Sequence, residues 1–249
     1  MRQKADYHLI ESYFWRYDNR NFISLLTKSG NKLIDNGNLS KEDYETIFAL
    51  VKDDSLNTFE RRIPPYLGHF IRQFNDETLG NSGKSLENQL TERYFDYLLQ
   101  LNSPFITEWY QFEIDVTNIL TASSCKKYQL PVEPELIGSG ELNEKLIRSS
   151  ARDFGIGNDF PKLEMILRAI EESDIMEREK KIDLIKWELL DERTFFHYFT
   201  IEKIFAYILK LDIIERWINL DKKTGEELFN RLLNDLESSQ NFSEEFDQK

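Results

Sequence analysis

The sequence predicts an all-α protein of packed helical lobes with no substantial β-sheet. Apolar residues recur at helical spacing along most of the 249 residues, and the alternation typical of strands is scarcely seen. Serine and aspartate stand just before several of these apolar stretches, where helix N-caps are expected. Proline and glycine mostly fall between the stretches. Together these three patterns indicate a chain of successive helices.

The N-terminal region predicts two helices separated by a polar turn. An amphipathic pattern covers residues 3–28, and Ser29-Gly30 closes it. Ser40 then has the position of an N-cap. The acids that follow it favour the positive end of a helix, so a short helix is expected over residues 43–52.

Three more helices are expected before residue 130. Pro64-Pro65 suits a first helical turn and opens a helix through Phe74. Ser85 opens a helix that runs to about Leu101, and Ser103-Pro104 opens the next one.

This last helix carries the most informative pattern of the chain. Residues 108–120 are apolar almost all round, yet Gln111, Asp115 and Asn118 form one polar stripe, with about a turn between neighbours. An acid in so apolar a helix is costly unless it is paired. We therefore expect the helix to cross the interior of the protein and its polar stripe to pair with a basic or amide side chain.

The second half predicts further helices, interrupted twice. Residues 130–140 hold two prolines and two glycines and are typical of a linker, and residues 154–161 form a second break. An apolar stripe then runs from Ile201 to Ile218, and Asp221 caps a last helix. We expect one all-helical unit over 1–249, with sub-lobes at 1–80, 85–153 and 161–237 and a flexible tail at 238–249.

Composition limits the possible partners and compartments. The formal charge of −13 argues against a nucleic-acid binder and serves either contact with proteins or solubility. The single Cys125 cannot form an internal disulfide, which favours a reducing compartment. No apolar run approaches the ~20 residues of a transmembrane helix, and the first residues lack the apolar core of a secretion signal. We expect a cytoplasmic protein without a transmembrane segment.

No reactive site can be assigned from the motifs. The histidines (His8, His69 and His197) and the lone cysteine lack metal-ligand spacing, and His197 is expected to be packed or hydrogen-bonded among four aromatic residues. Residues 80–85 resemble a phosphate loop, but Thr78 stands where its first glycine belongs. We expect no catalytic, cofactor-binding or metal-binding residue, and hence no cofactor.

Two groups of residues resemble a known family. The order Glu113-x-Asp115-x-x-Asn118-Ile119 is similar to a helix of the C subunits of V-type and archaeal-type rotary ATPases, which are called d in eukaryotic V-ATPases. The second half resembles more closely a shorter bacterial family, of undefined activity, that is encoded beside the genes of V-type ATPases. The matching stretches are Arg148–Gly155, Glu177–Trp187, Leu190–Phe199 and Glu215–Trp217.

This resemblance implies a non-catalytic, all-helical coupling subunit with pseudo-repeated lobes. Its expected partners are the membrane rotor ring and the central shaft subunits, so it would associate with the membrane through the ATPase complex. The family often has an arginine just after its Asn-Ile pair, where this chain has Ser123-Ser124. From nearby basic side chains, Arg148 or Arg152 is the expected partner of the stripe. The alternative is an unrelated cytoplasmic helical adaptor.

Overall fold

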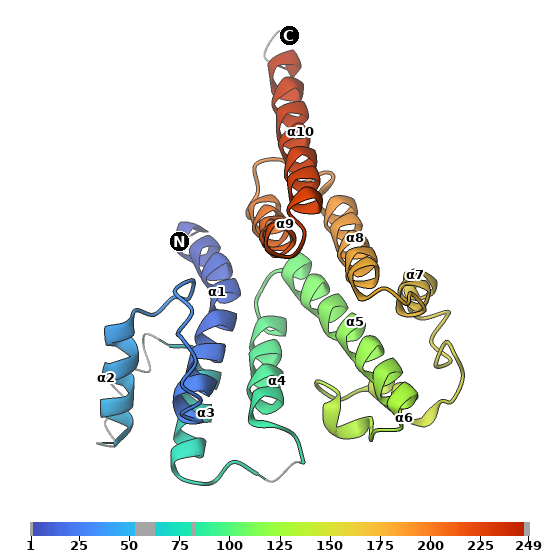
Figure 1. The fold of residues 1–249 in the computed structure, drawn as a ribbon. Coiled ribbons are helices and arrows are strands. Elements are labelled where there is room, and N and C mark those ends of the chain that lie inside the picture. Colours follow the sequence, from blue (N-terminus) through green and yellow to red (C-terminus); the bar gives the residue numbers. More distant parts are fainter. Residues whose placement is uncertain (1, 53–62, 81–82, 247–249) are drawn as a thin grey trace. The chain divides into compact units, whose positions relative to one another are not determined.

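A computed structural model of the chain describes residues 2–52, 63–80 and 83–246, and these ranges hold ten α-helices and one short 3-10 helix, with no strand (Figure 1). The all-α prediction is confirmed. The chain divides into two compact units, Met1–Ile170 and Glu171–Lys249. None of the helices within the described residues combines the length and apolarity needed to span a membrane.

Unit 1 holds the first seven α-helices, and α4 and α5 are central to its packing. Helix α4 packs on α1, α3 and α5, and α5 also contacts α6 and α7. The helices are α1 (Arg2–Leu26), α2 (Lys41–Lys52), α3 (Pro65–Asn75), α4 (Leu86–Leu99), α5 (Pro104–Tyr128), the 3-10 helix η2 (Glu133–Glu135), α6 (Glu141–Arg148) and α7 (Leu163–Ile170).

Unit 2 is built from α8 (Ile175–Thr194), α9 (Ile201–Leu220) and α10 (Lys222–Phe246). Helix α9 packs on both α8 and α10, and the two tryptophans Trp187 and Trp217 lie in the core with aliphatic residues of all three helices. Gly225 allows α10 to approach α9 closely, because a Cβ added there would lie 2.5 Å from the backbone nitrogen of Ile218. Both tryptophans are therefore core residues of unit 2.

The predicted helix starts follow from side-chain caps. The Ser40 Oγ accepts from the Asp43 amide at 3.2 Å, and Asp43 accepts from the Ser40 amide at 3.0 Å, which forms a reciprocal capping box. Ser85 Oγ accepts from the Asn88 amide at 3.0 Å, and Ser103 caps α5 ahead of Pro104. Each cap satisfies amide groups that a helix start leaves without a partner.

The segment interpreted as a linker, residues 130–140, lies inside unit 1 and separates no units. The division falls between Ile170 and Glu171 instead, because α7 packs on α5 and so belongs with the first unit. This differs from the expected lobe that begins at residue 161. Helix α10 continues to Phe246, so most of segment 238–249, expected as a flexible tail, is helical.

Candidate interaction site

The polar stripe of α5 is divided between the surface and the core of unit 1. Gln111 Nε2 donates to Asp115 Oδ1 at 2.9 Å on the exposed side of the helix, whereas Asn118 is 1% exposed. Burial raises the pKa of the half-buried Asp115, and the hydrogen bond from Gln111 opposes that rise. The expectation of a fully buried stripe therefore holds only for Asn118.

Arg148 and Arg152, the expected partners of this stripe, form ion pairs away from it. Arg148 Nη1 lies 3.4 Å from Glu144 Oε2 one turn earlier on α6, and Arg152 Nη1 lies 3.1 Å from Glu164 Oε2 on α7. Among the described residues, Asp115 receives its hydrogen bond from Gln111. Each arginine therefore pairs with a nearby glutamate and not with the polar stripe.

The partners of Asn118 are amides, which the sequence left open as an alternative to a basic residue. Asn118 Oδ1 accepts from the Ile137 amide at 2.9 Å, and its Nδ2 donates to the Ile137 carbonyl at 2.9 Å and to Asn143 Oδ1 at 3.0 Å. Asn143 Nδ2 donates to the same Ile137 carbonyl at 2.9 Å. Two buried asparagines thus hold the backbone of residues 136–138 against α5.

Glu92 on α4 and Lys84, which lies just before that helix, hold the same segment. Glu92 Oε1 accepts from the Gly138 amide at 2.8 Å and forms an ion pair with Lys84, and Lys84 Nζ donates to the Leu136 carbonyl at 2.9 Å. The donors and acceptors of these side chains are directed at protein backbone. We interpret this arrangement as a structural clamp on residues 136–138.

A buried carboxylate in the N-terminal part of unit 1 also has a structural explanation. Asp18 is fully buried and accepts from the Tyr44 hydroxyl at 2.5 Å and from the Asn38 and Leu39 amides at 2.8 and 3.2 Å. Burial raises its pKa, and these hydrogen bonds oppose the rise. A Cβ at Gly37 would lie 2.4 Å from Asp18 Oδ1, so the connection between α1 and α2 requires glycine there.

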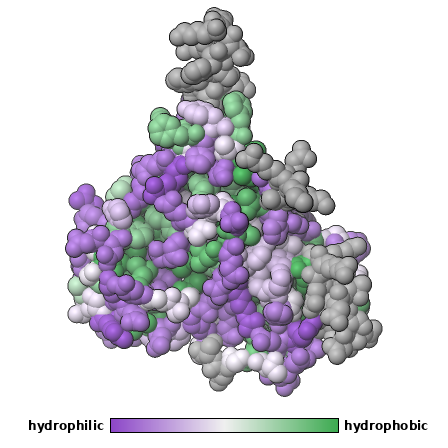
Figure 2. Space-filling view, turned by 180° about the vertical axis from the view of Figure 1, so that it is seen from behind, coloured by the Kyte–Doolittle hydropathy of each residue, from purple (hydrophilic) through white to green (hydrophobic). Residues whose placement is uncertain are grey.

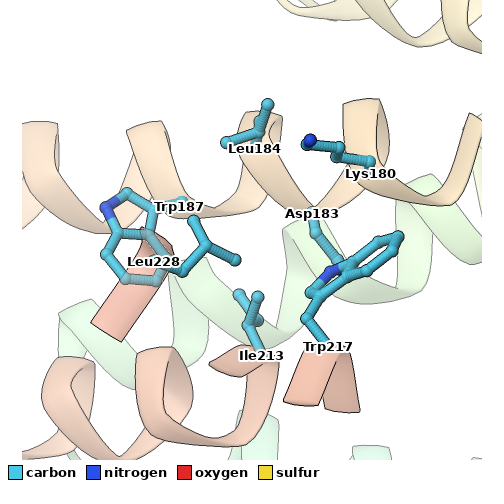
Figure 3. Close-up of a pocket in the computed structure, with 7 residues that line it drawn as sticks. All are labelled: Lys180, Asp183, Leu184, Trp187, Ile213, Trp217 and Leu228. Atoms are coloured by element: carbon cyan, nitrogen blue, oxygen red, sulfur yellow. The ribbon is translucent and has the colours of Figure 1, made fainter. Parts of the chain in front are cut away.

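Unit 2 has a buried carboxylate of its own. Asp183 on α8 accepts from the indole N–H of Trp217 at 2.8 Å and forms an ion pair with Arg216, both on α9. Figure 3 shows Asp183 beside the nitrogen of Trp217. Burial raises the pKa of Asp183, and the positive charge of Arg216 opposes the rise. This contact connects α8 to α9.

Two cations lie against Trp187 in the same unit. Lys210 Nζ is 4.7 Å from the centre of the indole ring, and the Arg231 guanidinium carbon is 5.4 Å from it. Both cations also form ion pairs with Asp191. The side chain of Lys210 is only 2% exposed, so its charge is buried. The Trp187 ring therefore stabilises a buried charge through cation–π contact and connects α8, α9 and α10.

A small hollow lies between these helices. Its cavity volume is about 10 Å³, and mostly apolar side chains line it together with Lys180 and Asp183 (Figure 3). The volume is below that of ordinary ligand pockets, ~300–1,000 Å³. No group of three or more potential metal ligands gathers within the part of the chain that the structure describes.

The loop between α8 and α9 exposes four aromatic side chains, Phe195, Phe196, Tyr198 and Phe199, which we call the aromatic loop. Their exposed fractions are 64, 82, 53 and 93%. At roughly 150–250 Å² per aromatic side chain, the loop exposes on the order of 400–700 Å², similar to the largest apolar patch of a typical monomer. Figure 2 shows apolar residues, in green, among hydrophilic ones, in purple, on one face of the molecule. Exposed apolar surface of this extent is typical of contact sites.

One residue of the aromatic loop has a strained backbone conformation. Phe199 has a positive φ of 55°, a conformation that costs energy for a bulky side chain and often accompanies function. His197 is 40% exposed and lies 3.5 Å from Thr200 Oγ1 and 3.7 Å from Glu202 Oε2. The prediction of a hydrogen-bonded histidine fits these distances, but the surrounding aromatics do not bury it.

Sequence reasoning did not identify the aromatic loop as a surface. The four aromatics in five positions were interpreted as packing for His197, because aromatic residues are usually core residues. The signal that could have identified this surface is the lack of helical spacing among the four aromatics. Residues that are adjacent in the sequence cannot all face one core, so some of them had to be exposed.

The family model described as a protein of unknown function (DUF2764) matches residues 2–240. The chain therefore belongs to this family. No curated protein and no solved structure matches it.

Proposed function

We propose that this member of the DUF2764 family is a non-catalytic coupling subunit of a V-type rotary ATPase. In this role, similar to that of the C subunits, it links the membrane rotor ring to the central shaft during ion transport and associates with the membrane through the complex. The observation that carries the proposal is the aromatic loop, an exposed apolar surface on a helical scaffold. Exposed aromatic side chains of this kind are typical anchors of protein interfaces.

The stretches that carry the family resemblance support the proposal through their placement. Asp183 lies in the stretch Glu177–Trp187, and its partners Arg216 and Trp217 lie in the stretch Glu215–Trp217. A third stretch, Leu190–Phe199, contains the whole aromatic loop. The resemblance thus covers both a buried connection between helices and an exposed surface.

The mechanical demands of a coupling part also fit unit 2. Such a part transmits torque, so its helices must not slide past one another. Asp183 and the Lys210–Asp191 pair connect α8 to α9, and Arg231 connects α10 to Asp191. Ion pairs with a buried member, here Lys210 and Asp183, favour one packing of the helices over arrangements in which the helices have shifted along one another.

Co-purification tests the proposal. The affinity-tagged chain, isolated from its native cell in mild detergent, should bring down the catalytic and shaft subunits of the ATPase. The variant Phe196→Ser/Phe199→Ser should lose them, and a variant at an exposed apolar residue elsewhere, Tyr128→Ser, should retain them. A wild-type preparation that lacks the ATPase subunits would refute the proposal.

A second candidate is an unrelated cytoplasmic helical adaptor. The aromatic loop favours it equally, because an exposed aromatic surface does not specify its partner. The same experiment separates the two. An adaptor would bring down other proteins, and the loop variant would lose those instead.

A further inference from the structure

Helix α9 is apolar on two opposite sides. One side is buried and contributes Ile213, Ile214 and Trp217 to the core of unit 2. The other side carries a row that we call the outer seam: Ile201, Ile204, Ile208, Leu211, Glu215 and Ile218. Ile204 and Leu211 are 52 and 46% exposed. Ile218 is 46% exposed and lies against Gly225 of α10, so the row is most open to solvent before Ile218.

The spacing of the outer seam is that of a coiled coil. Its residues alternate by three and four positions, which places them at successive a and d positions of a heptad. Such a row drifts by only ~20° per heptad around a straight helix, so it stays on one narrow face over roughly 26 Å. Because an apolar face of a helix is normally covered, this face has the geometry for a second helix.

The charge of the seam indicates which helix fits. Glu215 occupies an a position, is exposed and forms no ion pair with any described residue, and Asp212 lies beside the seam. A second copy would fit poorly. In parallel it would place Glu215 against Glu215, and in antiparallel order, where a positions pair with d positions, it would place Glu215 against an apolar residue such as Leu211. Two chains of charge −13 would also repel each other.

We infer that the outer seam of α9 docks an amphipathic helix of another protein, one with an apolar heptad row and with lysine or arginine opposite Glu215. Apolar contacts at the a and d positions supply affinity, and the basic residue sets the register. This inference goes beyond the proposed function, because it concerns α9 and not the aromatic loop that precedes it, and it holds for any partner of this chemistry.

Two designed helical peptides of about 20 residues test the inference, a length that matches the seam. Both carry leucine at every a and d position except the one opposite Glu215; one has lysines there and opposite Asp212, and the other has glutamates. Fluorescence anisotropy measures their binding to the full chain. The basic peptide should bind about threefold to fivefold more tightly than the acidic one, as expected for partly exposed ion pairs.

Three variants complete the test. Glu215→Lys should reverse the preference between the peptides, and Leu211→Lys should weaken both by at least about tenfold because it places a charge in the apolar contact. Leu220→Lys, at an exposed residue outside the seam, should bind as wild type does. Helix content from circular dichroism verifies that each variant is folded.

Three outcomes would overturn the inference. The first is that wild type binds neither peptide. The second is that it binds both equally and Glu215→Lys changes nothing. The third is that wild type sediments as a dimer and Leu211→Lys makes it a monomer, which would assign the seam to a second copy.

Discussion

Asn118 and Asn143 donate and accept across the core of unit 1, with Asn118 Nδ2 3.0 Å from Asn143 Oδ1, although the residues are 25 positions apart. Both bind the Ile137 carbonyl, and Asn118 also binds the Ile137 amide. A buried backbone group without a partner is costly. This asparagine pair therefore explains how a segment rich in proline and glycine stays ordered against α5.

Replacing Asn118 by leucine should destabilise the protein by ~1–3 kcal/mol, because the Ile137 amide and Asn143 Oδ1 lose their partner inside the core. Urea unfolding measures the change. The matched control is Gln111→Leu on the exposed side of the same helix, where a change within about 0.5 kcal/mol is expected. Equal losses in the two variants would contradict the clamp.

Gly37→Ala should destabilise by ~1–3 kcal/mol, because the new Cβ would stand 2.4 Å from Asp18 Oδ1 and force the connection between α1 and α2 to move. Gly80→Ala is the control, since nothing lies within 4 Å of its added Cβ. It should be neutral or slightly stabilising, through lower entropy of the unfolded chain. Thermal melting compares them, and a Gly37→Ala variant as stable as Gly80→Ala would refute this close approach.

Arg216→Ala should cost ~1–3 kcal/mol, because Asp183 would keep its charge in a buried position with the Trp217 indole and the more distant charge of Lys186 left to compensate it. The half-exposed position of Arg216 limits the loss. Arg178→Ala, which removes a 3.7 Å pair with Glu179, should change stability by less than about 1 kcal/mol. Denaturant unfolding, with tryptophan fluorescence as the signal, gives both values. If the two losses are alike, Arg216 does not compensate the Asp183 charge.

Stability should depend on pH through Asp115. Its native pKa is raised above the ordinary value of 3.8 by burial, so the native state binds the proton more readily than the unfolded state does. Wild type should therefore gain stability relative to Asp115→Asn as pH falls from about 7 to about 4, through the raised pKa toward the ordinary one. Urea unfolding of both proteins over this range measures the difference. A difference that stays constant, or that changes in the opposite direction, would contradict the raised pKa.

Local features were predictable from the sequence, and long-range pairings were not. Ser40, Ser85 and Ser103 mark helix starts because a cap acts within three residues, and Pro104 fits the first turn next to its cap. The partner of Asn118 could be predicted only as basic or amide. Proline and glycine in residues 130–140 suggested a linker, since composition cannot report hydrogen bonds to α5 that form across the fold.

The same limit applies to the surfaces. The stripe from Ile201 to Ile218 was visible as apolar spacing, but periodicity alone does not tell a core face from an exposed one. Its division into a buried side and the outer seam depends on where α8 and α10 pack against α9. Similarly, Arg148 and Arg152 were chosen for proximity, whereas acids on α6 and α7 provide their ion pairs.

The aromatic loop should contribute to binding and not to folding. Phe196→Ser and Phe199→Ser remove side chains that are 82 and 93% exposed, so each should change the free energy of unfolding by no more than about 0.5 kcal/mol. Phe205→Ala, at a fully buried position a few residues later, should cost ~3–5 kcal/mol. Serine at Phe199 retains the positive φ of 55° with a smaller side chain, so it should not raise the backbone strain. Urea unfolding of the three variants gives these values, and co-purification reports partner loss separately. A loop variant that unfolds as readily as Phe205→Ala would show that these rings stabilise the fold.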